Sequence, residues 1–253
     1  MKSSSLHTKD VNNARKESST KPSDDQNGVT VAFLGNSILY FNDTPRFLFN
    51  LGSKKIRHQN SCLRGGTTLT ELYTLGNGMK GHGFATDNAL MENATVIFVE
   101  TAAYRLQGIN NSQDLGTTEQ FQQSIREGIQ SYIQVLHDNT SISARMAPVG
   151  TAFLHVHNEN YDLWEKLFDP WDSFHPSPTG TFLQGCVLYC TIFGAAPPTC
   201  PGTREEIAAL WTDARMMHPK KKGNDGVPLP SVSEVEYLWK VAWDVCQLEK
   251  SKL

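Results

Sequence analysis

The chain has 253 residues, of which 39% are hydrophobic and 19% are charged, and its formal net charge is -3. This length suits one α/β domain with a substantial core, and the charge balance gives no electrostatic case for binding nucleic acid or an anionic membrane surface. No stretch approaches the about 20 consecutive apolar residues that a membrane span requires.

The domain is predicted to cover residues 29–253, preceded by a polar tail at residues 1–28. The tail is rich in Ser, Lys, Asp and Asn, so it cannot bury enough apolar surface to fold, and we expect it to be disordered. Its start lacks the apolar core of a secretion signal, and none of the five cysteines forms a Cys-x-x-Cys pair. Both features favour a reducing, cytoplasmic compartment.

The first half of the domain alternates short apolar runs with segments that carry apolar residues at helical spacing. The former pattern is typical of strands and the latter of helices. The predicted elements are a strand at 29–34, a helix from Thr44 or Pro45 to Gly52, a weaker strand at 58–63 and a short helix at 69–75.

The second half continues the alternation and then becomes helical. The predicted elements are a strand at 94–99, a helix at 118–137 capped by Thr117 or Thr118, a strand at 143–149, a partly helical segment at 150–168, a buried helix at 179–193 ending at Gly194, and helices at 203–216 and 232–248, the latter starting at Ser231 or Ser233. Strands that alternate with helices imply a parallel sheet with helices on both faces. The sequence therefore predicts an α/β fold, a three-layer α/β/α sandwich on which the last two helices pack.

Ser37 stands at the end of the first predicted strand, after the apolar run at 31–34, Gly35 and Asn36. The run predicts a buried strand that ends in a tight turn. Ligand sites of parallel α/β sheets form at the carboxyl ends of the strands. A serine at this position is either a helix cap or a nucleophile, and a cap is the more common role.

Asp172 and His175 are the residues that favour the nucleophile. They form Asp-x-x-His just before the buried helix at 179–193, and Pro176 and Pro178 stiffen that loop. The three-residue spacing lets the carboxylate hold one imidazole nitrogen while the other faces a serine. Either pattern alone is weak, but the two together in one parallel α/β domain indicate a serine hydrolase.

The two blocks resemble the first and last blocks of the SGNH/GDSL hydrolase superfamily. They are Leu-Gly-Asn-Ser at 34–37 and Asp-Ser-Phe-His-Pro-Ser at 172–177, and Gly-Thr-Phe-Leu-Gln-Gly-Cys at 180–186 continues the likeness. The likeness extends over roughly residues 29–194. Members of that superfamily are esterases, lipases or carbohydrate deacetylases with a flavodoxin-like three-layer fold. The resemblance implies such a fold, no cofactor, and a small-molecule or carbohydrate ester as substrate.

The same resemblance assigns roles to individual residues. It makes Ser37 the nucleophile, His175 the base and Asp172 its orienting partner. The backbone N–H groups of Ser37 and Gly65 would form most of the oxyanion hole.

The chain departs from this family pattern at the third block. The family places Gly-x-Asn-Asp there and uses the asparagine amide as an oxyanion donor, whereas this chain has Val-Glu-Thr-Ala-Ala-Tyr at 99–104. Loss of one such donor costs about 10²–10³ in rate. Thr101 or Tyr104 could donate instead, or Glu100 could position a water or a substrate hydroxyl, and the sequence does not choose among them.

Two weaker patterns accompany these blocks. His155 and His157 with Glu159 could recruit a metal, but no third ligand is identifiable by spacing, so we expect surface or pocket-rim histidines and no metal. A metal-dependent hydrolase built on His155 and His157 is a minor alternative. Trp171, beside Asp172, is a candidate for lining the substrate pocket with an aromatic face.

The sequence thus supports two hypotheses. The first is a hydrolase that cleaves carboxylic esters, including O-acetyl groups on carbohydrate, through an acyl-enzyme on Ser37. The second is a binding domain that keeps the fold and has lost activity with the third-block asparagine. The acyl group, the alcohol and the oligomeric state remain open.

Overall fold

The computed structural model describes residues 28–52, 55–68, 71, 94–104, 115–220 and 226–251. Within these ranges parallel strands alternate with helices, which confirms the predicted mixed α/β character. The helix predicted at 69–75, apart from Glu71, and the tail predicted at 1–28, apart from Gly28, lie outside the described residues.

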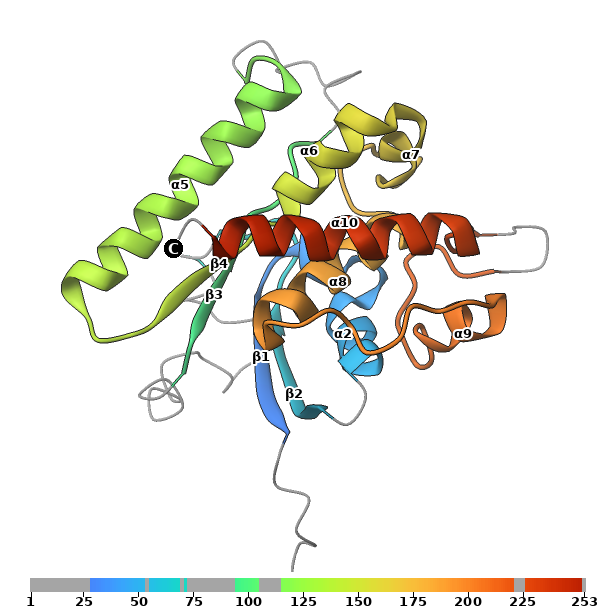
Figure 1. Ribbon diagram of the computed structural model, residues 1–253, viewed down its shortest axis with the longest axis horizontal. Helices are drawn as coiled ribbons and strands as arrows, with labels where there is room; N and C mark the ends of the chain where they lie inside the picture. Colours follow the sequence, from blue (N-terminus) through green and yellow to red (C-terminus); the bar gives the residue numbers. More distant parts are fainter. Residues whose placement is uncertain are drawn as a thin grey trace, which may run out of the picture.

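Four strands are described, and they pair in parallel as the sequence predicts. β1 (Val29–Gly35) pairs with β2 (Ile56–Leu63), and β3 (Val96–Val99) pairs with β4 (Ala144–Ala147). Among the described residues these pairs form two separate two-stranded sheets (Figure 1). A single sheet within a three-layer sandwich therefore stays a prediction.

β1 is less buried than its apolar sequence predicts. Val29, Thr30 and Ala32 are exposed, and within the strand only Phe33 is buried. β2 pairs with one edge of β1 and no strand among the described residues pairs with the other, so fewer neighbouring side chains flank those of β1 on the sheet faces. The predicted burial of this strand therefore holds for Phe33, partly for Val31 and Leu34, and not for Val29 and Ala32.

The helices carry most of the packing. They are α1 (Ser37–Tyr40), the 3₁₀ helix η1 (Phe41–Asp43), α2 (Thr44–Gly52), α5 (Thr118–Asn139), α6 (Val149–Glu159), α7 (Tyr161–Lys166), α8 (Pro178–Phe193), α9 (Arg204–Ala209) and α10 (Val232–Lys250). Thr117 and Ser231 start α5 and α10 with capping boxes, and Gly194 ends α8 in the left-handed conformation. The cap positions of these three helices agree with the sequence prediction.

α9 ends well before Met216, where the sequence predicts its end. Asn50 of α2 donates hydrogen bonds of 2.9 Å to the carbonyl oxygens of both Leu210 and Thr212. Asp213 then adopts a φ of 60°, which a continuing helix does not tolerate. The helix therefore stops because a distant side chain takes the carbonyl groups that further turns would use.

α8 forms the centre of the core. Every residue from Pro178 to Cys190 is buried, and the helix packs against α2, α6 and α10. In Figure 1, α10 crosses in front of α8, and α2 lies below α8 in the view. Gly185 lies against the ring of Phe47, and Gly180 lies against the carbonyl group of Leu167, both too closely for a side chain. The core thus closes around every face of this helix.

Within the described ranges, no helix combines the length and the apolar character that crossing a bilayer demands.

Replacing Gly180 by Ala tests this close packing. The added methyl group meets the Leu167 carbonyl, so we expect Gly180→Ala to lower the free energy of unfolding by about 1–3 kcal/mol. Gly128 of α5 is the control, because nothing lies within 4 Å of a Cβ placed there. Gly128→Ala should raise the free energy of unfolding by about 0.5–1 kcal/mol in urea denaturation. Equal effects of the two substitutions would contradict the packing described for α8.

Candidate active site

Ser37 is the first residue of α1 and follows β1 after a single residue, Asn36. Asn36 is the N-cap of α1, because its Oδ1 accepts the N–H of Ile38 at 3.1 Å. Its Nδ2 donates to the carbonyl oxygen of Thr67 at 3.4 Å. Asn36 therefore ties the turn that carries Ser37 to the loop after β2.

Gly65 lies in that loop and approaches α1 closely. β2 runs parallel to β1 with Leu63 opposite Gly35, and the N–H of Arg64 donates to the Gly35 carbonyl at 3.1 Å. A Cβ on Gly65 would lie 2.6 Å from the hydroxyl oxygen of Tyr40, the last residue of α1. Strand pairing thus brings the predicted oxyanion loop to the helix of Ser37, where a side chain in place of Gly65 would displace the hydroxyl group of Tyr40.

Asp172 and His175 form the contact that their spacing predicts. Oδ2 of Asp172 lies 2.7 Å from Nδ1 of His175, and Oδ1 accepts the N–H groups of Phe174 and His175 at 2.8 and 2.9 Å. Ser173 between them has a φ of 55°, which lets the chain turn tightly. One carboxylate therefore holds both the ring and the backbone of His175.

These bonds also determine the charge of Asp172. Partial burial opposes ionisation, but the hydrogen bonds from the His175 ring and from the two backbone N–H groups outweigh it, so the pKa of Asp172 is lowered. The carboxylate stays ionised to lower pH than an isolated aspartate. Because a carboxylate only accepts hydrogen bonds, a neutral His175 carries its proton on Nδ1.

The other nitrogen of His175, Nε2, is buried and has no hydrogen-bond partner among the described residues. No hydrogen bond joins it to Ser37 Oγ, although both residues are described. The face of the ring stacks on Phe41, with ring centroids 4.0 Å apart and planes 6° apart. Asp172 and Phe41 therefore hold the orientation of the His175 ring, and its Nε2 is an acceptor without a described partner.

Phe41 and Asn42 join the turn of Ser37 to the histidine loop. Both belong to η1, which directly follows α1. Besides the stacking of Phe41 on His175, Nδ2 of Asn42 donates to the buried carbonyl oxygen of Pro176 at 3.0 Å. Ser177 then caps α8 by accepting the N–H of Gly180 at 3.1 Å. The segments that carry the predicted nucleophile and base are thus held against each other.

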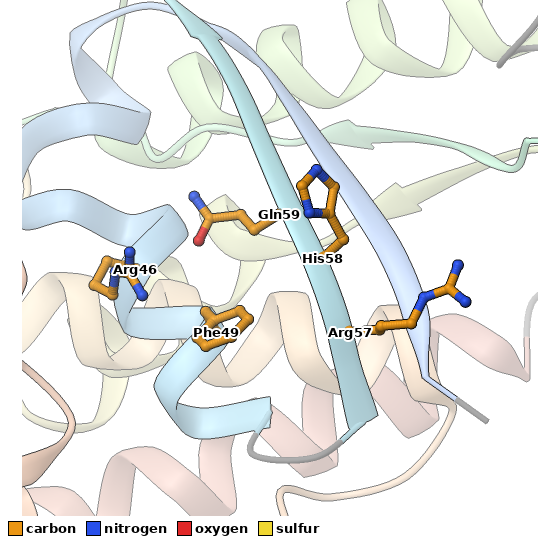
Figure 2. A pocket seen from close by; sticks show the side chains of 5 residues that line it. All are labelled: Arg46, Phe49, Arg57, His58 and Gln59. Atoms are coloured by element: carbon orange, nitrogen blue, oxygen red, sulfur yellow. The ribbon is translucent and has the colours of Figure 1, made fainter. Parts of the chain in front are cut away.

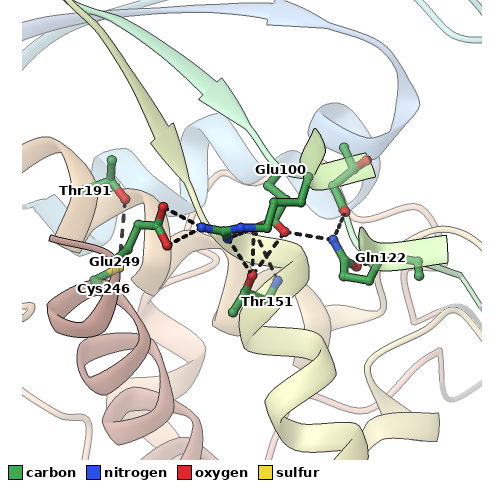
Figure 3. Close-up of polar contacts among 9 residues, drawn as sticks. Glu100, Gln122, Thr151, Thr191, Cys246 and Glu249 are labelled. Atoms are coloured by element: carbon green, nitrogen blue, oxygen red, sulfur yellow. Dashed lines mark hydrogen bonds and ion pairs between the residues drawn. The ribbon is translucent and has the colours of Figure 1, made fainter. Parts of the chain in front are cut away.

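Glu100 is fully buried in a polar network (Figure 3). Its carboxylate accepts hydrogen bonds from the Thr151 hydroxyl at 2.9 and 3.0 Å and from Gln122 at 3.1 Å. Arg126 lies 3.5 Å away and also pairs with Glu249 of α10. Burial raises the pKa of Glu100, against the opposing effects of Thr151 and Arg126. These bonds favour a structural role for Glu100 over the positioning of water.

Tyr104 lies next to the histidine loop, whereas Thr101 belongs to the network of Glu100. The ring of Tyr104 contacts the edges of Phe121 and Phe174 at centroid distances of 4.8 and 5.0 Å. The carbonyl oxygen of Thr101 accepts a hydrogen bond from Gln122 at 3.1 Å. Of the three residues considered for the missing oxyanion donor, Tyr104 is the one that contacts a neighbour of His175.

Trp171 is 60% exposed, and its ring contacts that of His218 with the planes tilted by 42°; no sequence pattern singled out His218. The ring centroids lie 3.9 Å apart. The backbone N–H of Trp171 donates to Oδ1 of the buried Asp169 at 2.9 Å, so the backbone that carries the exposed ring is held in place. No local pattern marks His218, because its partners come from distant parts of the chain.

Two surface cavities lie elsewhere. One of about 240 Å³ is lined by Arg46, Phe49, Arg57, His58 and Gln59, between α2 and β2. Figure 2 shows Gln59 extending toward Arg46 while Arg57 extends away from it, so the two guanidinium groups do not converge. The other, of about 230 Å³, lies between α6 and α10. Neither includes Ser37, Asp172 or His175.

The histidines of α6 make ordinary polar contacts. Nε2 of His155 lies 3.2 Å from Glu159, and Nδ1 of His157 lies 2.9 Å from Asn158. In the parts of the chain that the structure describes, no three side chains of His, Cys, Asp or Glu gather as metal ligands would.

Comparison with known proteins gives little beyond this geometry. No family model and no curated protein matches the chain. A solved structure of a gut microbial diltiazem-metabolizing enzyme is similar with 14% sequence identity and a TM-score of 0.37. The alignment covers 64% of this chain and 46% of that protein, so the chain spans less than half of its length. A likeness of this degree carries no argument about fold or activity.

Replacing Glu100 by Gln tests the buried network through its pH dependence. Because the pKa of Glu100 is raised in the folded state, its contribution to stability is present at low pH and is lost as pH rises through that pKa. Between pH 4 and neutrality, wild type should lose stability relative to Glu100→Gln by up to about 1.4 kcal/mol per pH unit. Urea unfolding of both proteins over this range measures the difference, and parallel curves would contradict the prediction.

Proposed function

We propose that the protein is a serine hydrolase that cleaves carboxylic esters through an acyl-enzyme on Ser37. The proposal is carried by the Asp172–His175 pair, in which a 2.7 Å contact holds Nδ1 and leaves Nε2 buried without a described partner. A histidine in that state is a base lacking only its proton donor. The contacts of Phe41 and Asn42 with the histidine loop support Ser37 as the partner of His175, because Ser37 precedes Phe41 by four residues.

In the first half of the reaction, the alcohol leaves. Nε2 of His175 takes the proton of Ser37 Oγ as Oγ bonds to the carbonyl carbon of the ester, and Asp172 stabilises the imidazolium ion. The tetrahedral intermediate then collapses. The bond between the carbonyl carbon and the alcohol oxygen breaks, and Nε2 returns the proton to that oxygen.

In the second half, water releases the acyl group. Nε2 takes a proton from water as the water oxygen bonds to the acyl carbon, and the bond to Ser37 Oγ breaks with return of the proton to Oγ. The products are the free serine and a carboxylic acid, so no cofactor enters the balance.

We assign the oxyanion hole to the N–H groups of Ser37 and Gly65, with the hydroxyl group of Tyr104 as third donor. The close approach of Gly65 to Tyr40 supports the first part, since it brings the loop backbone to α1. The contact of Tyr104 with Phe174 supports the second. No hydrogen bond of the Tyr104 hydroxyl to the described residues competes with this role.

The proposed substrates include O-acetylated carbohydrates. Trp171 presents an exposed aromatic ring one residue before Asp172, and the flat apolar face of an indole suits a sugar ring or an acyl chain.

One observation favours the alternative of an inactive binding domain. Ser37 and His175 are both described, yet no hydrogen bond joins them. Catalytic hydrogen bonds are often long before substrate binds, so this geometry alone does not remove the hydrolase proposal. Chemical labelling separates the two functions.

A fluorophosphonate probe tests whether Ser37 is an activated nucleophile. We expect wild type to be labelled and Ser37→Ala to remain unlabelled, because the probe bonds only to a serine whose hydroxyl group a base deprotonates. Ser131→Ala is the matched control, since Ser131 is exposed on α5 and its hydroxyl group donates to the Glu127 carbonyl. Labelling is read by intact-mass spectrometry.

Failure of a folded wild-type protein to react would favour the binding domain. Labelling that persists in Ser37→Ala would show that another serine reacts.

Tyr104→Phe tests the third oxyanion donor. The substitution keeps the ring contacts with Phe121 and Phe174 and removes the hydroxyl group, so kcat on a short-chain ester should fall about 10²-fold with KM nearly unchanged. Tyr132→Phe on the exposed face of α5 is the control. Full activity of Tyr104→Phe, together with loss of activity in Thr101→Val, would transfer the role to Thr101.

A further inference from the structure

His218 belongs to a row of rings that ends at the predicted base. Its ring contacts Trp171 at a centroid distance of 3.9 Å and meets Phe41 edge-on, at 6.3 Å and 68°. Phe41 is buried and in turn stacks on His175 with nearly parallel planes. The orientation of the His175 ring therefore depends on Phe41, and Phe41 has His218 as a neighbour.

Asp169 provides a second connection between His218 and His175. Its side chain is 1% exposed, and its Oδ2 lies 3.1 Å from Nε2 of His218, without the alignment of a hydrogen bond. Its backbone N–H donates to the carbonyl oxygen of His175 at 2.7 Å. His218 is thus the described group that faces this buried carboxylate oxygen, and the same aspartate binds the backbone of the predicted base.

The segment that carries His218 is fixed on η1. The N–H of Arg215 donates to Oδ2 of Asp43 at 3.0 Å, and the N–H of Met217 donates to Oδ1 of Asn42 at 3.4 Å. Asn42 also binds the Pro176 carbonyl of the histidine loop. The short helix η1 therefore binds both the histidine loop and the segment that carries His218, and this arrangement places His218 beside Phe41.

We propose that His218 is a positioning residue for His175, acting through the ring of Phe41 and the carboxylate of Asp169. This inference rests on the proposed function, because it assigns to His218 the task of keeping Nε2 of His175 directed at the proton of Ser37. His218 itself takes no proton from the substrate or from Ser37. Misplacement of a base by about 1 Å costs on the order of 10²-fold in rate, so partial loss of this support has a measurable effect.

The test uses two substitutions of His218 in the full chain. His218→Leu removes both the ring and its polar atoms. His218→Gln removes the ring edge beside Phe41 and retains a side-chain N–H donor, so it is the milder variant for the buried carboxylate of Asp169. His137→Gln is the matched control, because the side chain of His137 is 83% exposed on α5.

Two readouts distinguish positioning from general stability. The first is the rate of fluorophosphonate labelling, which we expect to fall about tenfold in both variants and to stay unchanged in the control. The second is the set of ring ¹⁵N chemical shifts of His175, assigned by comparison with His175→Gln. These shifts report which nitrogen carries the proton and should change in both variants, since the ring tilts against Asp172. Thermal unfolding identifies any variant that does not fold.

The results decide between clear alternatives. If a folded His218→Gln or His218→Leu is labelled at the wild-type rate, or if labelling slows while the His175 shifts stay constant, the positioning role is overturned. If wild type itself is not labelled, the proposed function fails. The inference about His218 fails as well if, in addition, the His175 shifts do not change in the His218 variants. A shift change in that case would retain the coupling of the two histidines.

Discussion

The burial of α8 on all sides is the constraint on which the rest of the structure depends. A helix enclosed by α2, α6 and α10 has no solvent-exposed face for a charged side chain. It also needs glycines at the positions where Phe47 and the Leu167 carbonyl group approach it. Its N-cap, Ser177, is therefore fixed in the core, with its hydroxyl group donating to the Lys166 carbonyl. The position of His175, two residues earlier, follows from this fixed start, so the geometry of the site is a consequence of core packing.

Local signals predicted those features that depend on neighbouring residues. The caps at Thr117, Ser231 and Gly194 and the Asp172–His175 contact all lie within a few residues of their partners, so their chemistry is visible in the sequence. The early end of α9 was not predictable, because Asn50 lies in α2, far from Leu210 in the sequence. The exposure of β1 was missed for a related reason: an apolar run predicts burial but does not identify what covers it.

The site combines local and distant constraints in the same way. Sequence patterns marked Ser37 and His175 as separate candidates, and the contacts of Phe41 and Asn42 explain how their segments meet. Asn42 and Asp43 have φ values of 50° and 54°, which non-glycine residues adopt rarely and which persist only when surrounding contacts maintain them. Both side chains also bind the segment that carries His218. No pattern in the sequence indicates this double use of η1, and His218 was missed as a result.

The attachment of α5 has a consequence for cooperativity. Within this helix, all of which is described, the buried residue is Gln122, and Tyr132 and Val135 are largely exposed. α5 is held at one end by the hydrogen bonds of Gln122 and by Arg126, which bridges Glu100 and Glu249, while its other end extends away from α8 (Figure 1). Ring contacts of Phe121 with Tyr104 and of Tyr132 with Phe98 add apolar packing, but α5 buries far fewer of its residues than α8 and so gains less from apolar burial. Hydrogen exchange should therefore reveal two units, an α5 that opens at low free energy and a core around α8 that exchanges only on global unfolding.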